Sequence, residues 1–489
     1  MELNSQYHSQ IEEYELADRA SRRIYKRITD NGQNNEALNY FRELTRSFEG
    51  HLNAIPTGSS IQMTRAIALE VYPISQIEAL KRRLTHLFDH SPSLDASTRR
   101  SFHRRLNDFT SNTKFNAGMH SITHFHESTI SLRSRLFIGF TFSLELVGGY
   151  LVRIYIHFKP ADGLNKQLSA IAEEQYQTRL TLRHGLRGFR RAIVPRVDFG
   201  NTRKSKVLMK LDRSVTQDLC SVVGKRFLPG IYLEFFNGLP LVHTLTYSDA
   251  AENQPSSPGS SPSSPHVFLK LLLKPSPDYQ QTQYHSDSND VFVELRSRKK
   301  VRLESYSKYV TAKGDGLFSC FDVLPIFAEK EVLWLQASML CELEGVFMRM
   351  IHNGNISGQR RKRFQIYRLS SLYRTFSKGF DNRIFFKPGA YNSPIAGLSI
   401  EVGNGKRLDY CEMGVKEIRS ARLLFDEHLK PLLQACELAK DEASDSFQRW
   451  IQLLIVLLSL IAVPLAQVFW ERHLNYHHPA KNSSTRIAH

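Results

Sequence analysis

The chain has 489 residues, 41% of them hydrophobic, which is enough for two or three domains with real cores. Its 65 lysines and arginines outnumber the 48 acidic residues and leave a formal charge of +17. Such an excess points to polyanionic partners, meaning nucleic acid, nucleotides or an anionic lipid surface, and says nothing of the fold. The first residues include several acids and no apolar run, so we expect neither a signal peptide nor a transit peptide.

Residues 1–118 are predicted to form a helical domain of about four helices. Apolar residues recur there at spacings of three and four, the period of one face of a helix. The clearest stripe consists of Ala37, Leu38, Phe41, Leu44, Phe48 and Leu52. The fourth helix has Asp95 or Ser97 as its expected N-cap, because short polar side chains accept hydrogen bonds from the first helical turn.

Residues 119–250 are predicted to form an α+β domain, and its best-defined element is a hairpin. Apolar and polar residues alternate along two neighbouring segments, as in strands with one buried face. A three-residue turn, with a glycine at positive φ, sets Glu145 opposite Arg153, which is a favourable pair of charges. The same register pairs Leu144 with Ile154, so that the apolar faces of both strands agree.

The rest of this region mixes helices and strands. Its predicted elements are a helix over residues 163–186, strands near 192–197 and 206–211, a short helix near 215–223, and a hairpin that turns at Asn237 and Gly238. An Asn-Gly pair between apolar runs is the strongest short-range signal for a hairpin turn. Helices beside hairpins favour an α+β fold.

Residues 251–265 are predicted to be a disordered linker, because a segment so rich in serine and proline is too polar to pack and unsuited to a helix. Residues 266–412 are predicted to be a second α+β region. Its expected elements are a strand at 267–275, a strand pair within 290–310, one or two buried helices within 323–351, and a hairpin turning at Asn404 and Gly405. This region either forms a domain of its own or completes the sheet of the first.

The last part of the chain is predicted to be helical and to end in a membrane. Residues 413–448 form a membrane-proximal helix with an apolar stripe, for which we favour packing on the chain's own domain over a coiled coil between subunits. The stripe consists of Phe425, Leu429, Leu432, Cys436 and Ala439. Residues 449–471 are predicted to be a single transmembrane helix, and residues 472–489 a short polar tail.

The transmembrane prediction rests on residues 450–470, which include no charged residue. A helix of this length covers about 31 Å, the thickness of a bilayer's hydrocarbon. Trp450 and Trp470 mark its ends, where aromatic rings favour the level of the headgroups. With one late span and no export signal, we expect the body of the protein in the cytoplasm. Five scattered cysteines without a CxxC pair fit reduced thiols in that compartment.

Two basic stretches are the candidate polyanion-binding sites. Eleven basic residues accompany two acids between residues 179 and 213, and no acid falls between residues 360 and 378. Guanidinium groups bind phosphate bidentately, and the interleaved aromatic rings can stack on bases. The residues selected are Arg187, Arg190, Arg191, Arg360, Arg361, Arg363 and Arg368. Such patches could equally lie on anionic lipid or form solvated faces.

His120, His124 and His126 form a close histidine cluster, and on a strand they would share one face and could ligate a metal. His124 and His126 enclose a phenylalanine, and this motif resembles the His-hydrophobic-His pattern of metal-dependent nicking and replication enzymes. The resemblance implies a pair on a central strand and a tyrosine nucleophile. The tyrosines that follow are Tyr150, Tyr155 and Tyr176, and no pattern selects one of them.

The sequence carries no phosphate-loop, zinc-protease, serine-hydrolase or kinase signature, so an enzyme is not the favoured prediction. We expect a tail-anchored, single-pass membrane protein whose basic cytoplasmic body binds a polyanion, as a sensor, adaptor or effector. One alternative is a membrane-tethered, metal-dependent enzyme acting on nucleic acid. The other is an oligomer that disrupts the membrane when a ligand binds. The expected partners are membrane lipid, nucleic acid or nucleotide, and a second copy through the membrane-proximal helix; the sequence indicates no cofactor.

Overall fold

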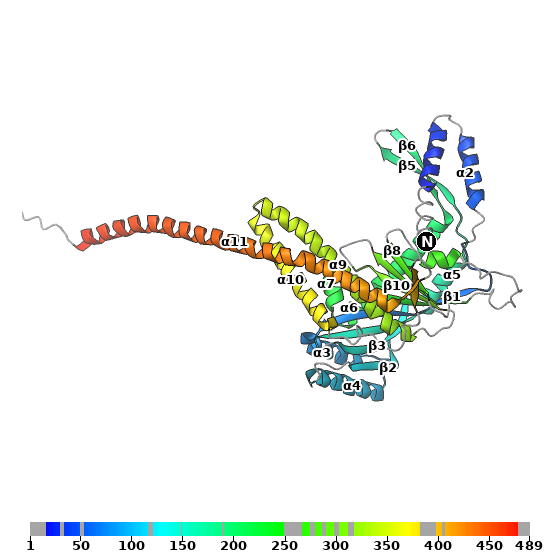
Figure 1. Ribbon diagram of the computed structural model, residues 1–489, viewed down its shortest axis with the longest axis horizontal. Helices are drawn as coiled ribbons and strands as arrows, with labels where there is room; N and C mark the ends of the chain where they lie inside the picture. The colour runs from blue at the N-terminus through cyan, green and yellow to red at the C-terminus, as the bar shows by residue number, and fades with distance from the viewer. Residues whose placement is uncertain are drawn as a thin grey trace, which may run out of the picture. The chain divides into compact units, whose positions relative to one another are not determined.

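The computed structural model describes residues 16–29, 34–48, 53–115, 121–147, 149–187, 190–248, 267–273, 279–285, 290–297, 303–311, 317–381, 398–402 and 406–477. The predicted linker at 251–265 lies outside these residues. The chain divides into two compact units, of which unit 1 contains residues 1–339 and 371–425. Unit 2 contains residues 340–370 and 426–489. Figure 1 shows the helices and strands with their labels.

Unit 1 contains a large mixed sheet, which joins ten strands of the described part of the chain (Figure 1). The strands are β1 Ser60–Pro73, β2 Ser121–Ser131, β3 Phe137–Val147, β4 Leu151–Pro160, β7 Leu241–Ser248, β8 Tyr279–His285, β9 Val291–Ser297, β10 Tyr306–Thr311, β11 Ser399–Val402 and β12 Lys406–Asp409. Their order is β12-β11-β8-β9-β10-β7-β1-β4-β3-β2. The parallel pairing of β10 with β7 joins the strands of 266–412 to those that precede the linker. Residues 266–412 therefore complete the first sheet.

Eleven helices accompany the sheet in the described residues, which gives the mixed α+β fold that the sequence predicts. They are a helix over residues 16–29, α2 Asn34–Phe48, α3 Ile77–Asp89, α4 Ala96–Phe115, α5 Asp162–Glu173, α6 Gly200–Arg226, α7 Ile231–Phe236, α8 Val267–Leu273, α9 Leu317–His352, α10 Ile356–Asp381 and α11 Tyr410–His477, with a 3₁₀ turn at Ile74–Gln76. On one face of the sheet, Phe88 of α3 stacks on Phe142 of β3 at 6.0 Å. On the other face, Lys330 of α9 contacts Glu294 of β9.

The strand β1 corrects the prediction that residues 1–118 are helical throughout. It pairs with β4 on one side and with β7 on the other, so it lies inside the sheet. Its residues 66–72 are all buried, whichever face they occupy. A strand buried on both faces lacks the polar alternation that identifies a half-buried strand, and its alanine, methionine and glutamate residues suit a helix equally well.

The predicted β3–β4 hairpin is confirmed in its register. Glu145 lies opposite Arg153, and Leu144 lies opposite Ile154. The turn takes three residues, and Gly149 adopts the predicted positive φ of 71°. The predicted N-cap is also confirmed, because Asp95 Oδ1 accepts a hydrogen bond of 2.7 Å from the backbone N–H of Thr98.

Three segments predicted as strands are helical instead. Residues 206–211 belong to the long helix α6, residues 267–273 form α8, and the first arm of the predicted hairpin at residues 231–236 forms α7. Asn237 takes a left-handed conformation, with φ of 49°, at the end of α7. A left-handed residue ends a helix as readily as it turns a hairpin, and here it ends a helix.

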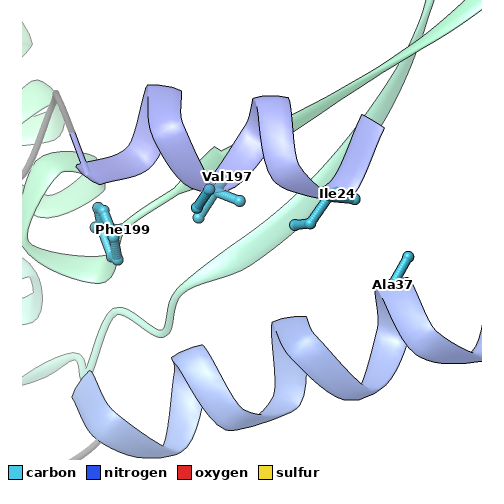
Figure 2. Packing of buried hydrophobic residues seen from close by; sticks show 5 residues of the cluster. Ile24, Ala37, Val197 and Phe199 are labelled. Atoms are coloured by element: carbon cyan, nitrogen blue, oxygen red, sulfur yellow. The ribbon is translucent and has the colours of Figure 1, made fainter. Parts of the chain in front are cut away.

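The hairpin of β5 (Arg179–Arg187) and β6 (Arg190–Asp198) packs against the first two helices. Ile24 and Ala37, from the helix at 16–29 and from α2, are buried together with Val197 and Phe199 at the end of the hairpin (Figure 2). The backbone N–H of Val197 also donates to Ser21 Oγ at 3.1 Å. The N-terminal helices therefore hold the base of this basic hairpin.

The helix α11 is longer than the predicted membrane-proximal helix and continues through the predicted membrane segment. The apolar stripe from Phe425 to Ala439 is buried, and Phe425 stacks on Tyr373 of α10 at 3.9 Å. This contact agrees with packing on the chain's own helices. The described residues include no helix whose length and apolarity meet what a bilayer crossing requires, so the predicted transmembrane helix at 449–471 is not supported. Side chains at 461 and 463–470 lie outside the description.

Candidate functional site

The far part of α11 exposes a continuous run of apolar side chains. Trp450 is 69% exposed, and eight large aliphatic side chains between residues 451 and 460 are exposed with it. These are Ile451, Leu453, Leu454, Ile455, Val456, Leu457, Leu458 and Leu460. Burying one such side chain contributes about 1.5–3 kcal/mol, so this run leaves on the order of 10 kcal/mol or more unrealised in water.

The exposed run covers the whole circumference of the helix rather than one stripe. Residues 453–458 are six consecutive apolar residues, and consecutive residues of a helix point about 100° apart. A partner helix or a groove covers one side of a helix, whereas hydrocarbon covers every side. The arrangement therefore suits a lipid environment better than a docking groove.

A basic group lies at the start of α10 in unit 2. Arg360 and Arg361 are exposed, and Arg363 is half-buried. Arg368, which is also exposed, lies two turns further along the same helix. The structure thus places four of the seven predicted polyanion-binding residues on one helix, three of them within its first eight residues.

Contacts with α11 fix the direction of α10. Tyr373 stacks on Phe425, and ten residues earlier Arg363 interacts with Cys436, eleven residues further along α11. The two helices are therefore antiparallel, and the start of α10 lies toward the far part of α11. At 1.5 Å per residue, Cys436 lies about 21 Å before Trp450 along the helix. Figure 1 shows α11 continuing past the α9–α10 hairpin.

Burial raises the pKa of Cys436 to about 11, and the charge of Arg363 opposes that shift. In the same unit, His428 Nδ1 of α11 lies 2.8 Å from Glu344 Oε2 of α9. The His428–Glu344 pair links α11 to α9, and the electrostatic interaction of Arg363 with Cys436 links α11 to α10.

The other basic group is on the β5–β6 hairpin. Its backbone pairs Arg187 with Arg190 and Leu186 with Arg191, so the three predicted arginines lie next to the turn. Their side chains lie outside the described residues. The backbone therefore gives the position of these arginines in the fold, and their contacts are not described.

The first turns of α11 begin in a buried network of ion pairs in unit 1. Lys330 Nζ of α9 lies 2.8 Å from Glu294 Oε2 of β9 and 3.3 Å from Glu417 Oε2 of α11. The Tyr410 hydroxyl donates a hydrogen bond of 2.6 Å to Glu294 Oε1. Arg296 Nη2 lies 2.5 Å from Glu417 Oε2. Sheet, α9 and α11 are thereby tied together by charges removed from water.

The pKa shifts in this network follow from burial and pairing. Glu331 of α9 also pairs with Arg296. Burial raises the pKa of Glu331, although Arg296 and the Ser305 hydroxyl oppose the shift. Burial also opposes ionisation of Glu417, but Lys330 and Arg296 outweigh it and lower the pKa of that carboxyl below its ordinary value. Glu417 is therefore held as a carboxylate by its two cationic partners.

The histidines at 124 and 126 lie on β2, at one end of the sheet order. His124 Nδ1 lies 2.9 Å from Ser143 Oγ of β3, and His126 Nε2 lies 2.7 Å from the same oxygen. His157 of β4 joins them, with its ring centroid 5.1 Å from that of His126. His120 lies outside the described residues. The sequence did not select His157, because its partners come from two other strands.

The imidazoles of His126 and His157 are neutral at pH 7. Burial lowers the pKa of His126 to about 4 and that of His157 to about 3, and neighbouring positive charge adds to both shifts. Neutral imidazole is the metal-binding form. Even so, no three His, Cys, Asp or Glu side chains in the described part of the chain are placed to hold a metal ion. A terminal strand also differs from the central strand that the resemblance implies, so the metal site stays a prediction.

Sequence reasoning missed the buried ion network altogether. Its signal was present as charged residues inside apolar segments, namely Glu294 within a strand-like run and Lys330 within a buried-helix pattern. A charge at such a position needs a partner, and the partner is not visible from spacing alone.

No protein-family model, curated protein or solved structure matches this chain.

Proposed function

We propose that the chain is a membrane-anchored protein in which the apolar part of α11 inserts into lipid and the start of α10 binds polyanionic groups at the surface. The observation that carries this proposal is the run at residues 453–458, where exposed apolar side chains point in every direction around the helix. The sequence adds that residues 450–470 include no charge and begin and end with tryptophan.

The basic group at the start of α10 fits anionic headgroups. Arg360 and Arg361 lie toward the end of α10 that points to the apolar run. They precede Arg363, whose charge acts on Cys436 of α11, about 21 Å before Trp450. Headgroups extend beyond the hydrocarbon by several ångströms, and surface potential reaches about one Debye length further, roughly 8–10 Å. Each basic residue near such a surface contributes about 1 kcal/mol.

We also propose that the body lies on the cytoplasmic side of this membrane. Four cysteines of the described residues are free thiols, namely Cys220, Cys341, Cys411 and Cys436. Free thiols are typical of a reducing compartment. Assembly through the membrane-proximal helix remains a prediction, which the size of the detergent-solubilised protein would test.

Insertion is tested by placing charge in the apolar run of the full chain. The double substitution Leu454→Arg and Leu457→Arg costs about 2.5–3.5 kcal/mol per residue at the centre of a lipid-spanning helix. We expect the unaltered chain to stay in the membrane pellet after alkaline carbonate extraction and the double variant to appear in the supernatant. The control is Leu438→Arg, at another exposed position of the same helix before the run. Equal extraction of all three chains would contradict insertion.

Surface binding is tested separately, in the double variant that no longer inserts. We expect it to associate with vesicles that mix phosphatidylcholine and phosphatidylserine, and less with phosphatidylcholine alone. Reversing Arg360, Arg361 and Arg363 to glutamate removes about 3 kcal/mol of attraction, or on the order of 100-fold in binding. The matched control reverses Arg82, Arg100 and Arg104, which are exposed elsewhere. If both triple variants bind alike, the α10 residues are not the lipid-binding group.

A further inference from the structure

A basic cavity of about 260 Å³ opens in unit 1, away from the basic residues already discussed. It lies where the end of α3, the segment after β2 and the end of α6 meet. The positively charged and imidazole residues that line it are Arg83, His86, His90, Arg133, Lys225 and Arg226. None of the described lining residues carries a carboxyl group.

The walls of the cavity are fixed by contacts among its own residues. Arg83 Nη2 donates a hydrogen bond to the backbone oxygen of Lys225 and so joins α3 to the end of α6. His90 Nδ1 donates to the backbone oxygen of His86 at 2.9 Å, and the two rings stack with centroids 4.0 Å apart. Arg133, Lys225 and Arg226 remain exposed, so their charged groups are accessible from solvent.

Helix ends explain only a fraction of this charge. Cations are commonly found at the C-terminal end of a helix, which carries about half a negative charge. Two such ends meet here, so together they offset roughly one positive charge. The cavity carries four, from Arg83, Arg133, Lys225 and Arg226, and Arg133 belongs to neither helix. The remaining positive charge lacks a protein carboxylate among the lining residues.

We propose that this cavity binds a small phosphorylated molecule, whose phosphate oxygens contact Arg133, Lys225 and Arg226. Guanidinium and ammonium groups bind phosphate through short, charge-assisted hydrogen bonds. The volume is slightly below the roughly 300–1,000 Å³ of pockets for drug-sized ligands, which suits one or two phosphate groups with a small organic part. The site does not depend on the membrane proposal, since it uses no residue of unit 2.

The test is calorimetric titration of the full chain in detergent with inorganic pyrophosphate. We expect saturable binding, and at least a tenfold weaker affinity in the double variant Arg133→Gln and Arg226→Gln. The control is Arg82→Gln with Lys210→Gln, which removes one exposed charge from α3 and one from α6 outside the cavity. This control should bind as the unaltered chain does. Circular dichroism melting of each variant verifies folding, and Lys225→Gln alone serves if the double variant unfolds.

Two results would overturn the proposal: no saturable binding of pyrophosphate, or equal affinity in the cavity variant and the control. A second arm separates the sources of the phosphate. Binding of glycerol 3-phosphate in solution assigns the site to a soluble phosphate ester. Binding only to nanodiscs that contain phosphatidic acid, lost in the cavity variant and kept in the control, assigns it to a lipid headgroup. Failure of both compounds contradicts a phosphate-monoester site.

Discussion

The two ends of α11 are opposite in chemistry although they belong to one helix. At its start, the buried Tyr410 and the partly buried Glu417 are held by charged partners from β9 and α9. Forty residues later, Leu453 and its neighbours stand exposed on every side. Charges are buried where water is excluded, and apolar groups are exposed where nothing in the chain covers them within the described residues.

This contrast teaches that the helix is built for two surroundings. The start of α11 is stable because each buried charge has an oppositely charged partner, an arrangement that penalises the loss of any one member. The far part exposes its apolar side chains, and under the proposed function lipid would bury them. Substitutions at the two ends should therefore have different readouts: unfolding at the start, and membrane retention at the far part.

The largest effect is expected from Lys330→Met. It removes the cation nearest to the fully buried Glu294 and one of the two cations that face Glu417. Breaking a buried pair in this way costs about 3–5 kcal/mol. Urea unfolding of the full chain in detergent, followed by circular dichroism, measures the loss. Lys430→Met, at an exposed position of α11, is the control. Similar midpoints for the two variants would show that the network contributes little.

A smaller effect is expected from a matched pair of glycines. At Gly414, near the start of α11, an added Cβ would clash with the Ile326 side chain of α9, and Gly414→Ala should destabilise by about 1–3 kcal/mol. At Gly345, an exposed position of α9, an added Cβ meets nothing, so Gly345→Ala should stabilise by about 0.5–1 kcal/mol. Thermal unfolding measures both. A loss of stability at Gly345 would contradict the exposure of that helix face.

The smallest expected effect is on the pH dependence of stability at acid pH. The pKa of Glu417 is lower in the folded chain than its ordinary value, because Lys330 and Arg296 outweigh burial. The unfolded chain thus binds this proton more readily, and the stability from Glu417 is present above about pH 4.5 and is lost as the pH falls through the lowered pKa. The free energy of unfolding, measured from pH 7 to pH 3, should decrease more steeply in the unaltered chain than in Glu417→Gln.

The other end of α11 gives the contrasting result. Residues 450–470 contain no ionisable group, so the fraction of the chain that sediments with membranes should not change between pH 5 and pH 8. In the acid experiment on Glu417, the free energy of unfolding could instead fall equally steeply with pH in the unaltered chain and in Glu417→Gln. That result would mean that the ion pairs at the start of α11 do not control its acid sensitivity.

The sequence predicts those elements in which polar and apolar residues alternate. The β3–β4 hairpin is such a case: both strands are buried on both faces along most of their length, yet the alternation and the Glu145–Arg153 pair suffice to set the register. The strand β1 is the opposite case, because its buried part lacks this alternation and is composed of residues that also suit helices. Asn237 shows a third limit, since its left-handed conformation fits either a hairpin turn or the end of α7.

The candidate site was predictable to the same extent. The charge-free run at 450–470 is one uninterrupted segment of the sequence, and so is the basic start of α10. Local composition therefore identifies each of them. The cavity around Arg133 and Lys225 joins three segments that are far apart in the chain, and no local pattern unites them. The ion network has the same property, because Glu294, Lys330 and Glu417 meet only after the sheet and helices have formed.

The most direct test of the central claim is the quenching of tryptophan fluorescence by brominated lipid. With Trp334→Phe, the remaining tryptophans are Trp450 and Trp470, at the two ends of the apolar run. If α11 inserts into lipid, their emission should fall in vesicles of brominated phosphatidylcholine relative to vesicles of the same lipid without bromine. In the variant that also carries Leu454→Arg and Leu457→Arg, the emission should be alike in both. If the chain with Trp334→Phe alone emits equally in the two kinds of vesicle, insertion is contradicted.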